Sequence, residues 1–192
     1  MIGDTLPDLV PFDSLGYFCL LSLLLFARGM DFLSTWVATP NLVLEGNPLA
    51  RRLGWKWGAL ANLALCFTFA FWPLTAIIVI TTGLLVAAHN FHAAWLMRTM
   101  GEEAYRDWFL ERVARTPRPL YFACLCGETF LTALPGAALI WFCTPGSLAF
   151  AIGIGIAGYA GIVLFYTSLS LWRLRRHEDK KEPYIIRDNL NS

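Results

Sequence analysis

The stretch LAFAIGIGIAGYAGIVLFYTSLSLW, residues 148–172, runs for 25 positions without a charged side chain. About 20 apolar residues in a helix cross the hydrocarbon core of a bilayer, so this stretch predicts a membrane span. The whole chain has the same character, because 57% of its 192 residues are hydrophobic, 15% are charged and the mean hydropathy is +0.53. An ordinary soluble domain carries roughly 25% charged residues. Strand-like alternation is lacking, so the sequence predicts an all-α, polytopic transmembrane bundle.

Five apolar stretches are long enough to act as spans, and turn signals separate them. Pro40, Pro73 and the turn TPGS at 144–147 each end one of the stretches. The predicted spans cover about 14–39, 54–72, 74–98, 119–143 and 148–172. We expect residues 1–175 to form a single transmembrane bundle and residues 176–192 to form a charged cytoplasmic tail.

The positions of lysine and arginine support this division independently. With these boundaries, all 15 basic residues except Arg28 fall in alternate loops, at the span ends that adjoin those loops, or in the tail, and therefore on one side of the membrane. Loops rich in Lys and Arg stay in the cytoplasm, so we expect the N-terminus outside and the C-terminus inside. The same pattern places the protein in a bacterial inner (cytoplasmic) membrane, with the lipid bilayer as its first partner. A net charge of +1 gives no support for a nucleic-acid partner.

The segment between the third and fourth predicted spans, GEEAYRDWFLERVARTP at 101–117, is amphipathic. Its apolar residues recur at helical spacing among acids and arginines. This pattern predicts a helix over about 101–116 that lies on the cytoplasmic membrane face. The alternative is a solvated connector helix that packs on the end of the bundle.

Four of the five spans place a polar side chain at a similar depth, in the inner half of the membrane. These side chains are Asp31, Asn62, His89 and Glu128, each eight or nine residues from the cytoplasmic end of its span. An ionisable group facing lipid costs at least about 2.5–3.5 kcal/mol, so we expect them to converge inside the bundle. The predicted members of this polar layer, taken as binding residues, are Arg28, Asp31, Thr35, Asn62, His89, Asn90, His92 and Glu128.

The sequence is compatible with three interpretations of the polar layer. In the first, it is a structural hydrogen-bond network that fixes the register of the helices. In the second, it serves a membrane-embedded hydrolase or lipid-modifying enzyme, with His89 as a general base oriented by Asp31 or Glu128. A divalent metal held by His89, His92 and Asp31 would be the metal-dependent version. The two histidines are three positions apart, rather than the four of an H-E-x-x-H helix.

The third interpretation, which we take as the working hypothesis, is binding. The polar layer would hold an ion, a lipid headgroup or a pigment within a membrane assembly. A single histidine in a membrane helix can ligate a haem or chlorophyll-type macrocycle, whereas a bis-histidine haem needs ligands from facing helices. Both membrane histidines lie on one span, so a bis-His haem within one copy is disfavoured.

Two further features have predicted roles. An interfacial rim after the first span, formed by Glu45, Asn47, Arg51 and Arg52, would attract anionic headgroups over the polar layer. In the last span, Gly153, Ala157 and Gly161 recur at four-residue steps and would let another helix approach closely. Packing within one copy is favoured over self-association through this face.

The motif Asp31-x3-Thr35, followed by Glu45-x-Asn47-Pro48, resembles the pattern of a family of small bacterial and archaeal membrane proteins. Their first helix carries Asp and Thr, and a Glu-x-Asn-Pro loop follows it. The resemblance covers residues 27–57, about a sixth of the chain. Members often have a lysine in the second helix, where this sequence has Asn62. The resemblance implies a shared helical bundle and no particular activity.

Overall fold

The computed structural model describes the backbone of residues 4–45 and 48–188, and the side chains of 4–45 and 50–169. Within these ranges the protein is all-helical, with six helices and no strand, which confirms the all-α part of the predicted fold class. A single antiparallel bridge pairs Thr5 with Ser147. The helices are α1 (Leu15–Ala38), α2 (Pro48–Phe69), α3 (Pro73–Met100), α4 (Glu102–Arg115), α5 (Arg118–Phe142) and α6 (Leu148–Asp188).

Four helical segments in the described chain are long and apolar enough to cross a membrane, namely α1, α3, α5 and the Leu148–Leu169 part of α6. These helices are consistent with a multi-pass membrane protein. The predicted second span, 54–72, is not among them. Helix α2 breaks at Gly54, where φ is 64° and ψ is −173°, and it ends at Phe69. Its first turns carry Arg51, Arg52 and Lys56, which lower its hydropathy.

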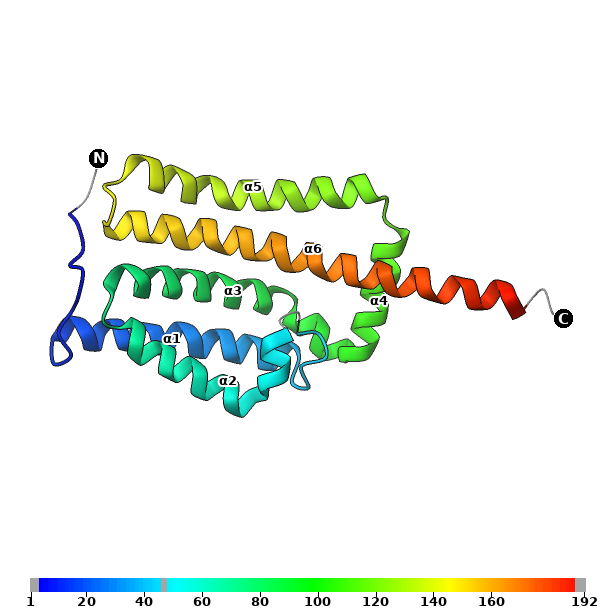
Figure 1. The fold of residues 1–192 in the computed structure, drawn as a ribbon, viewed down its shortest axis with the longest axis horizontal. Helices are drawn as coiled ribbons and strands as arrows, with labels where there is room; N and C mark the ends of the chain where they lie inside the picture. Colours follow the sequence, from blue (N-terminus) through cyan, green and yellow to red (C-terminus); the bar gives the residue numbers. More distant parts are fainter. Residues whose placement is uncertain (1–3, 46–47, 189–192) are drawn as a thin grey trace.

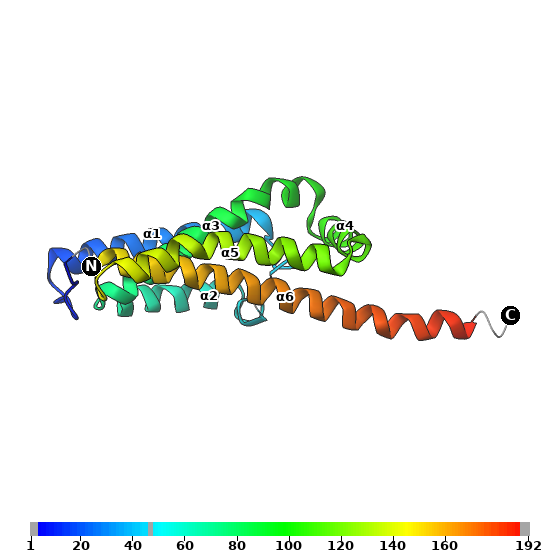
Figure 2. The same ribbon diagram turned by 90° about the horizontal axis from the view of Figure 1, so that it is seen from above.

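The helices lie side by side in the order α1, α3, α6 and α5, with α2 along the outer side of α1 (Figures 1 and 2). The N-terminal segment, the α2–α3 turn and the α5–α6 turn lie at one end of the bundle (Figure 1). The α1–α2 loop, α4 and the last part of α6 lie at the other end. These two groups of connections correspond to the two sides that the positions of Lys and Arg distinguish in the sequence.

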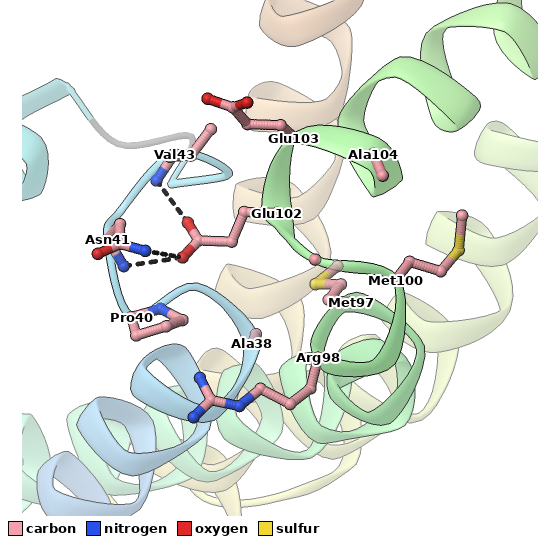
Figure 3. A pocket seen from close by; sticks show the side chains of 11 residues that line it. Ala38, Pro40, Asn41, Val43, Met97, Arg98, Met100, Glu102, Glu103 and Ala104 are labelled. Carbon is pink, nitrogen blue, oxygen red and sulfur yellow. Dashed lines mark hydrogen bonds between the residues drawn. The ribbon is translucent and has the colours of Figure 1, made fainter.

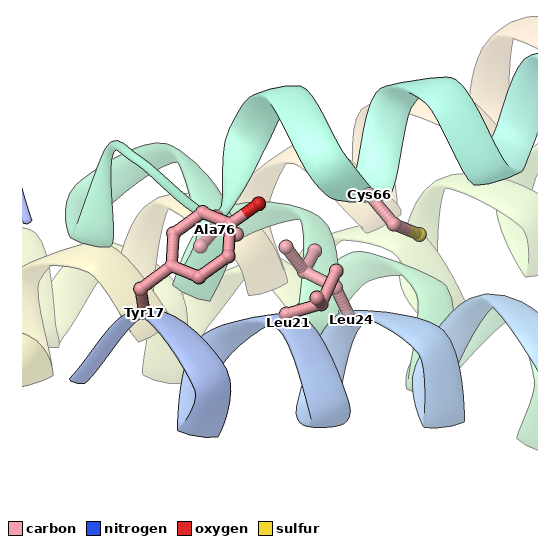
Figure 4. Close-up of a cluster of buried hydrophobic side chains, with 6 residues drawn as sticks. Tyr17, Leu21, Leu24, Cys66 and Ala76 are labelled. Atoms are coloured by element: carbon pink, nitrogen blue, oxygen red, sulfur yellow. The ribbon is translucent and has the colours of Figure 1, made fainter. Parts of the chain in front are cut away.

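The N-terminal segment is hydrogen-bonded to both turns at the first end of the bundle. The backbone N–H of Leu6 donates to the carbonyl of Gly146 at 2.9 Å, and that of Val10 donates to the carbonyl of Phe71 at 3.0 Å. Below these contacts lies a cluster of buried side chains from α1, α2 and α3 (Figure 4), formed by Tyr17, Leu21, Leu24, Cys66, Ala70 and Ala76. The Tyr17 hydroxyl also donates to the carbonyl of Phe67 at 3.2 Å. Burial of this cluster holds α2 against α1.

Small residues allow α6 to approach both of its neighbours. A Cβ placed on Gly136 of α5 would lie 2.8 Å from the carbonyl oxygen of Gly153 and 3.0 Å from the nitrogen of Ala157. On the other side of α6, a Cβ on Gly155 would lie 2.7 Å from the Cβ of Thr81 in α3. Gly153 and Ala157 therefore pack within the monomer. Gly161 has no heavy atom within 4 Å of a Cβ built on it.

Two segments outside the predicted spans also contain helix. The amphipathic segment predicted over about 101–116 forms α4, which lies across the direction of the other helices (Figure 1). Helix α6 runs through the predicted boundary at residue 175 without a break and continues to Asp188. Residues 176–188 of the predicted tail are thus a helical extension, and 189–192 lie outside the described residues.

Candidate functional site

An ion pair on α1 forms the centre of a polar network between α1, α2 and α3. Arg28 Nη1 lies 2.8 Å from Asp31 Oδ2, and Arg28 Nε donates to Asn62 Oδ1 of α2 at 2.6 Å. The Asn62 amide in turn donates to the carbonyl of Gly58 at 2.8 Å. The Arg28 and Asp31 side chains are 29% and 16% exposed. The two charges in the apolar first helix therefore neutralise each other in a partly buried position.

A second part of the network joins α3 to α1. Asn90 Nδ2 lies 3.3 Å from Ser34 Oγ and 3.4 Å from Thr35 Oγ1. Ser34 is fully buried and donates to the carbonyl of Asp31 at 2.8 Å. Sequence reasoning missed Ser34, although its position three residues after Asp31 was a usable signal. The structure thus brings together five predicted members of the polar layer: Arg28, Asp31, Thr35, Asn62 and Asn90.

The other three predicted members, His89, His92 and Glu128, are exposed and lie outside this network. The expected convergence of the whole polar layer in the bundle interior is therefore wrong for them. The face of α3 that packs against its neighbours is made by small residues at 76, 83, 87 and 94. His89 and His92 fall on other sides of the helix. In the described part of the chain, no three His, Cys, Asp or Glu side chains form a group that could hold a metal ion, so His89, His92 and Asp31 are not assembled.

One of these exposed residues, His89, has a ring contact with Tyr159 of α6, and the charge of Glu128 acts on the same tyrosine from α5. The rings of His89 and Tyr159 are 6.3 Å apart between centroids, in an edge-on arrangement. Glu128 of α5 lies within electrostatic range of the Tyr159 side chain, which is 9% exposed. We call His89, Tyr159 and Glu128 the flank cluster. Tyr159 was missed by sequence reasoning, although it stands in the Gly-rich centre of the last span, where polar groups are few.

A third polar cluster, at the end of the bundle that carries α4, is formed around Glu102. Its carboxylate accepts hydrogen bonds from the Thr39 hydroxyl, from the backbone and side-chain N–H groups of Asn41 at 2.9 Å each, and from the Val43 N–H at 3.0 Å. Partial burial raises the pKa of Glu102, but these hydrogen bonds outweigh burial and hold the pKa below its ordinary value. Glu102 therefore ties the start of α4 to the loop after α1. No predicted site residue belongs to this cluster.

A pocket of about 620 Å³ opens beside Glu102. The α1–α2 loop forms one wall, and the end of α3 with the start of α4 forms the other (Figure 3). Arg98 and Glu103 lie on opposite sides of this pocket, and Met97 and Met100 add apolar surface (Figure 3). The Arg98 guanidinium is 5.7 Å from the ring centre of Trp36 on α1.

The predicted interfacial rim lies at the same end of the bundle. Arg51 and Arg52 are exposed at the start of α2, and Glu45 is half-buried. Asn47 lies outside the described residues. The indole N–H of Trp55 donates to the carbonyl of Pro40 at 2.9 Å and so connects the kink of α2 to the loop.

No protein-family model, curated protein or solved structure matches this chain. The resemblance of residues 27–57 to a family of small membrane proteins stays a prediction.

Proposed function

We propose that this chain is a membrane protein of five spans, with its N-terminus outside and its C-terminus inside the bacterial cytoplasmic membrane. We further propose that it binds the headgroup of a phospholipid bearing both a phosphate and an ammonium group. The binding site would be the pocket between the α1–α2 loop, the end of α3 and the start of α4.

The proposal of five spans depends on α2. The part of α2 after Gly54 covers 15 residues up to Phe69, or roughly 22 Å at 1.5 Å per residue. This is shorter than the roughly 30 Å hydrocarbon core. Trp55, Lys56 and Trp57 stand at its start, and such side chains extend a short span into the headgroup region. The path of α2 back along α1 to the opposite end of the bundle (Figure 1) supports a crossing.

The position and size of the pocket favour a lipid headgroup. The pocket lies where the apolar parts of α1 and α3 end and the amphipathic α4 begins, as expected of the membrane interface. Its volume of about 620 Å³ is far larger than a bare ion and falls in the range of small-molecule sites, about 300–1,000 Å³. The apolar surface of Met97 and Met100 suits the glycerol and upper acyl carbons.

The opposite charges on the two sides of the pocket support a headgroup with one negative and one positive group. These charges are the observation on which the proposal depends. Arg98 would pair with the phosphate, and its contact with Trp36 limits the positions its guanidinium can adopt. Glu103, on the opposite side of the pocket, would pair with the ammonium group. Glu102 is already bonded to the loop and acts as a wall of the pocket.

The polar network of Arg28, Asp31 and Asn62 is assigned a structural role in this proposal. Its charges are paired, and no buried side-chain N or O atom in the described residues lacks a hydrogen bond. A network whose groups are all satisfied fixes the register of the helices without needing a ligand. It would hold α1, α2 and α3 in the arrangement that shapes the pocket.

Native mass spectrometry with added phosphatidylethanolamine tests the lipid proposal, with phosphatidylglycerol as the comparison lipid because it lacks the amine. Arg98→Gln and Glu103→Gln should each weaken binding of phosphatidylethanolamine about tenfold, the loss expected for one charge-assisted interaction. Matched controls are Arg112→Gln and Glu111→Gln, which are exposed on α4 outside the pocket. Equal losses in the controls, or equal binding of the two lipids by the wild type, would count against the proposed site.

A further inference from the structure

The flank cluster has hydrogen-bonding capacity that the monomer does not use. Within the described residues, His89, Tyr159 and Glu128 make no hydrogen bond or ion pair, and both His89 and Glu128 are exposed. In the proposed membrane placement the His89 and Glu128 side chains would face lipid, where ionisable groups are costly. A surface of this kind needs a binding partner with complementary polar groups, and acyl chains have no such groups.

The arrangement of the helices makes this surface complementary to a second copy of itself. Helix α6 lies between α3 and α5 (Figure 1), so Tyr159 stands between His89 on one neighbour and Glu128 on the other. Two copies inserted in the same direction can be related by a two-fold axis along the membrane normal. If that axis passes in front of α6, the α3 helix of one copy faces the α5 helix of its partner.

Depth in the membrane also matches. His89 lies nine residues before Arg98, and Glu128 lies nine residues after Pro119, so both are roughly 13 Å from the same end of the bundle. A two-fold axis along the membrane normal leaves depth unchanged. His89 of one copy and Glu128 of its partner therefore come to the same level, and the same pair forms a second time across the axis.

We propose that the flank cluster is the interface of a homodimer, in which His89 of each copy pairs with Glu128 of the other. Tyr159 of both copies lies near the axis and adds a hydroxyl that can donate to either pair. The acid and the base are on one surface, and this favours a second copy over a partner that would have to supply both groups separately. The interface differs from the face of Gly153 and Ala157, which is filled by α5 within the monomer.

A direct test uses two variants, each of which replaces one member of the His89–Glu128 pair by the other. Wild-type protein and two variants, His89→Glu and Glu128→His, are labelled with donor and acceptor dyes and reconstituted in phosphatidylcholine vesicles. Energy transfer is measured over a series of protein-to-lipid ratios. Each variant alone would place like groups opposite each other, and its self-association should fall about tenfold, the size expected for two interhelical polar contacts in a membrane.

An equal mixture of the two variants restores both complementary pairs, but only between different copies. Association in the mixture should therefore return to within about twofold of the wild type. His92→Glu is the control, since His92 is exposed on α3 outside the flank cluster. Glu128→Gln, which keeps the size of the side chain, should also weaken self-association and is a second variant if the exchanged ones fail to insert.

Three results would overturn the proposal. The first is a wild type that stays monomeric at every protein-to-lipid ratio, which would leave a lipid or another protein as the cover. The second is self-association of Glu128→Gln equal to that of the wild type. The third is a mixture of His89→Glu and Glu128→His that associates no better than either variant alone.

Discussion

Arg28 and Asp31 form an ion pair of 2.8 Å within α1, and the Arg28 guanidinium reaches across to Asn62 of α2 at 2.6 Å. This relationship explains why an apolar helix carries two opposite charges. Each charge is the partner of the other, and through Asn62 they join α1 to α2.

The ion pair should show strong coupling in a double-mutant cycle. Arg28→Gln and Asp31→Asn should each lower the free energy of unfolding by about 1–3 kcal/mol, because each leaves one charge partly buried without a partner. The double variant should lose less than the sum, with a coupling of about 0.5–3 kcal/mol. Thermal unfolding in detergent provides the measurement. The exposed pair Arg106 and Asp107 on α4 is the control and should show coupling near zero.

The close approach of α5 and α6 predicts a difference between glycines of the same helix. Gly153→Ala should destabilise the bundle by about 1–3 kcal/mol, because the added methyl group would lie 2.8 Å from the carbonyl oxygen of Gly136. Gly161→Ala should be tolerated, because nothing lies within 4 Å of its Cβ. The melting temperatures of the two variants measure this difference in stability. Equal loss at both positions would indicate a helix-wide effect rather than a contact with α5.

The Glu102 cluster should give the stability of the bundle a dependence on acid pH. The pKa of Glu102 in the folded protein lies below its ordinary value of 4.5, so its contribution is present above pH 4.5 and is lost as the pH falls through the lower folded pKa. The melting temperature of the wild type minus that of Glu102→Gln should therefore shrink in this range. Glu103→Gln is the control, since Glu103 makes no hydrogen bond to the α1–α2 loop (Figure 3). A difference that stays constant down to acid pH would contradict the assignment.

The crossing of α2 can be tested by labelling. In a background without the five native cysteines, Asp8→Cys and Arg106→Cys place single thiols at exposed positions before α1 and on α4. With five spans, three crossings separate the two positions, so an impermeant maleimide should label Asp8→Cys on intact cells and Arg106→Cys only after permeabilisation. If α2 did not cross, two crossings would separate them, and both would label from the same side.

The ends of α1, α3, α4 and α5 could be predicted from the sequence to within a few residues, whereas the C-terminal end of α6 could not. The predicted span 14–39 corresponds to α1 at Leu15–Ala38, and 119–143 corresponds to α5 at Arg118–Phe142. Apolar length, prolines and charged turns are local properties, so they can be read without knowledge of the neighbours. The predicted second span was less accurate, because Gly54 breaks α2 and leaves a short apolar part whose crossing depends on its flanking residues.

The depth of each polar residue along its helix could also be predicted from the sequence. The direction in which the residue points around the helix axis could not. Successive residues of a helix point about 100° apart, so Asn90 can bond to α1 while its neighbour His89 contacts Tyr159 of α6. Nothing in the spacing of polar residues alone decides which of them turns inward.

Apolar length and charge placement are properties of each segment alone, so they were enough to predict a helical bundle with membrane-spanning character. The division of the polar layer depends on how the helices pack: five of its residues form the network around Arg28, His89 and Glu128 belong to the flank cluster around Tyr159, and His92 lies in neither. Small residues on α3 and α6 set how closely each helix packs, and close packing fixes the rotation of every helix about its axis.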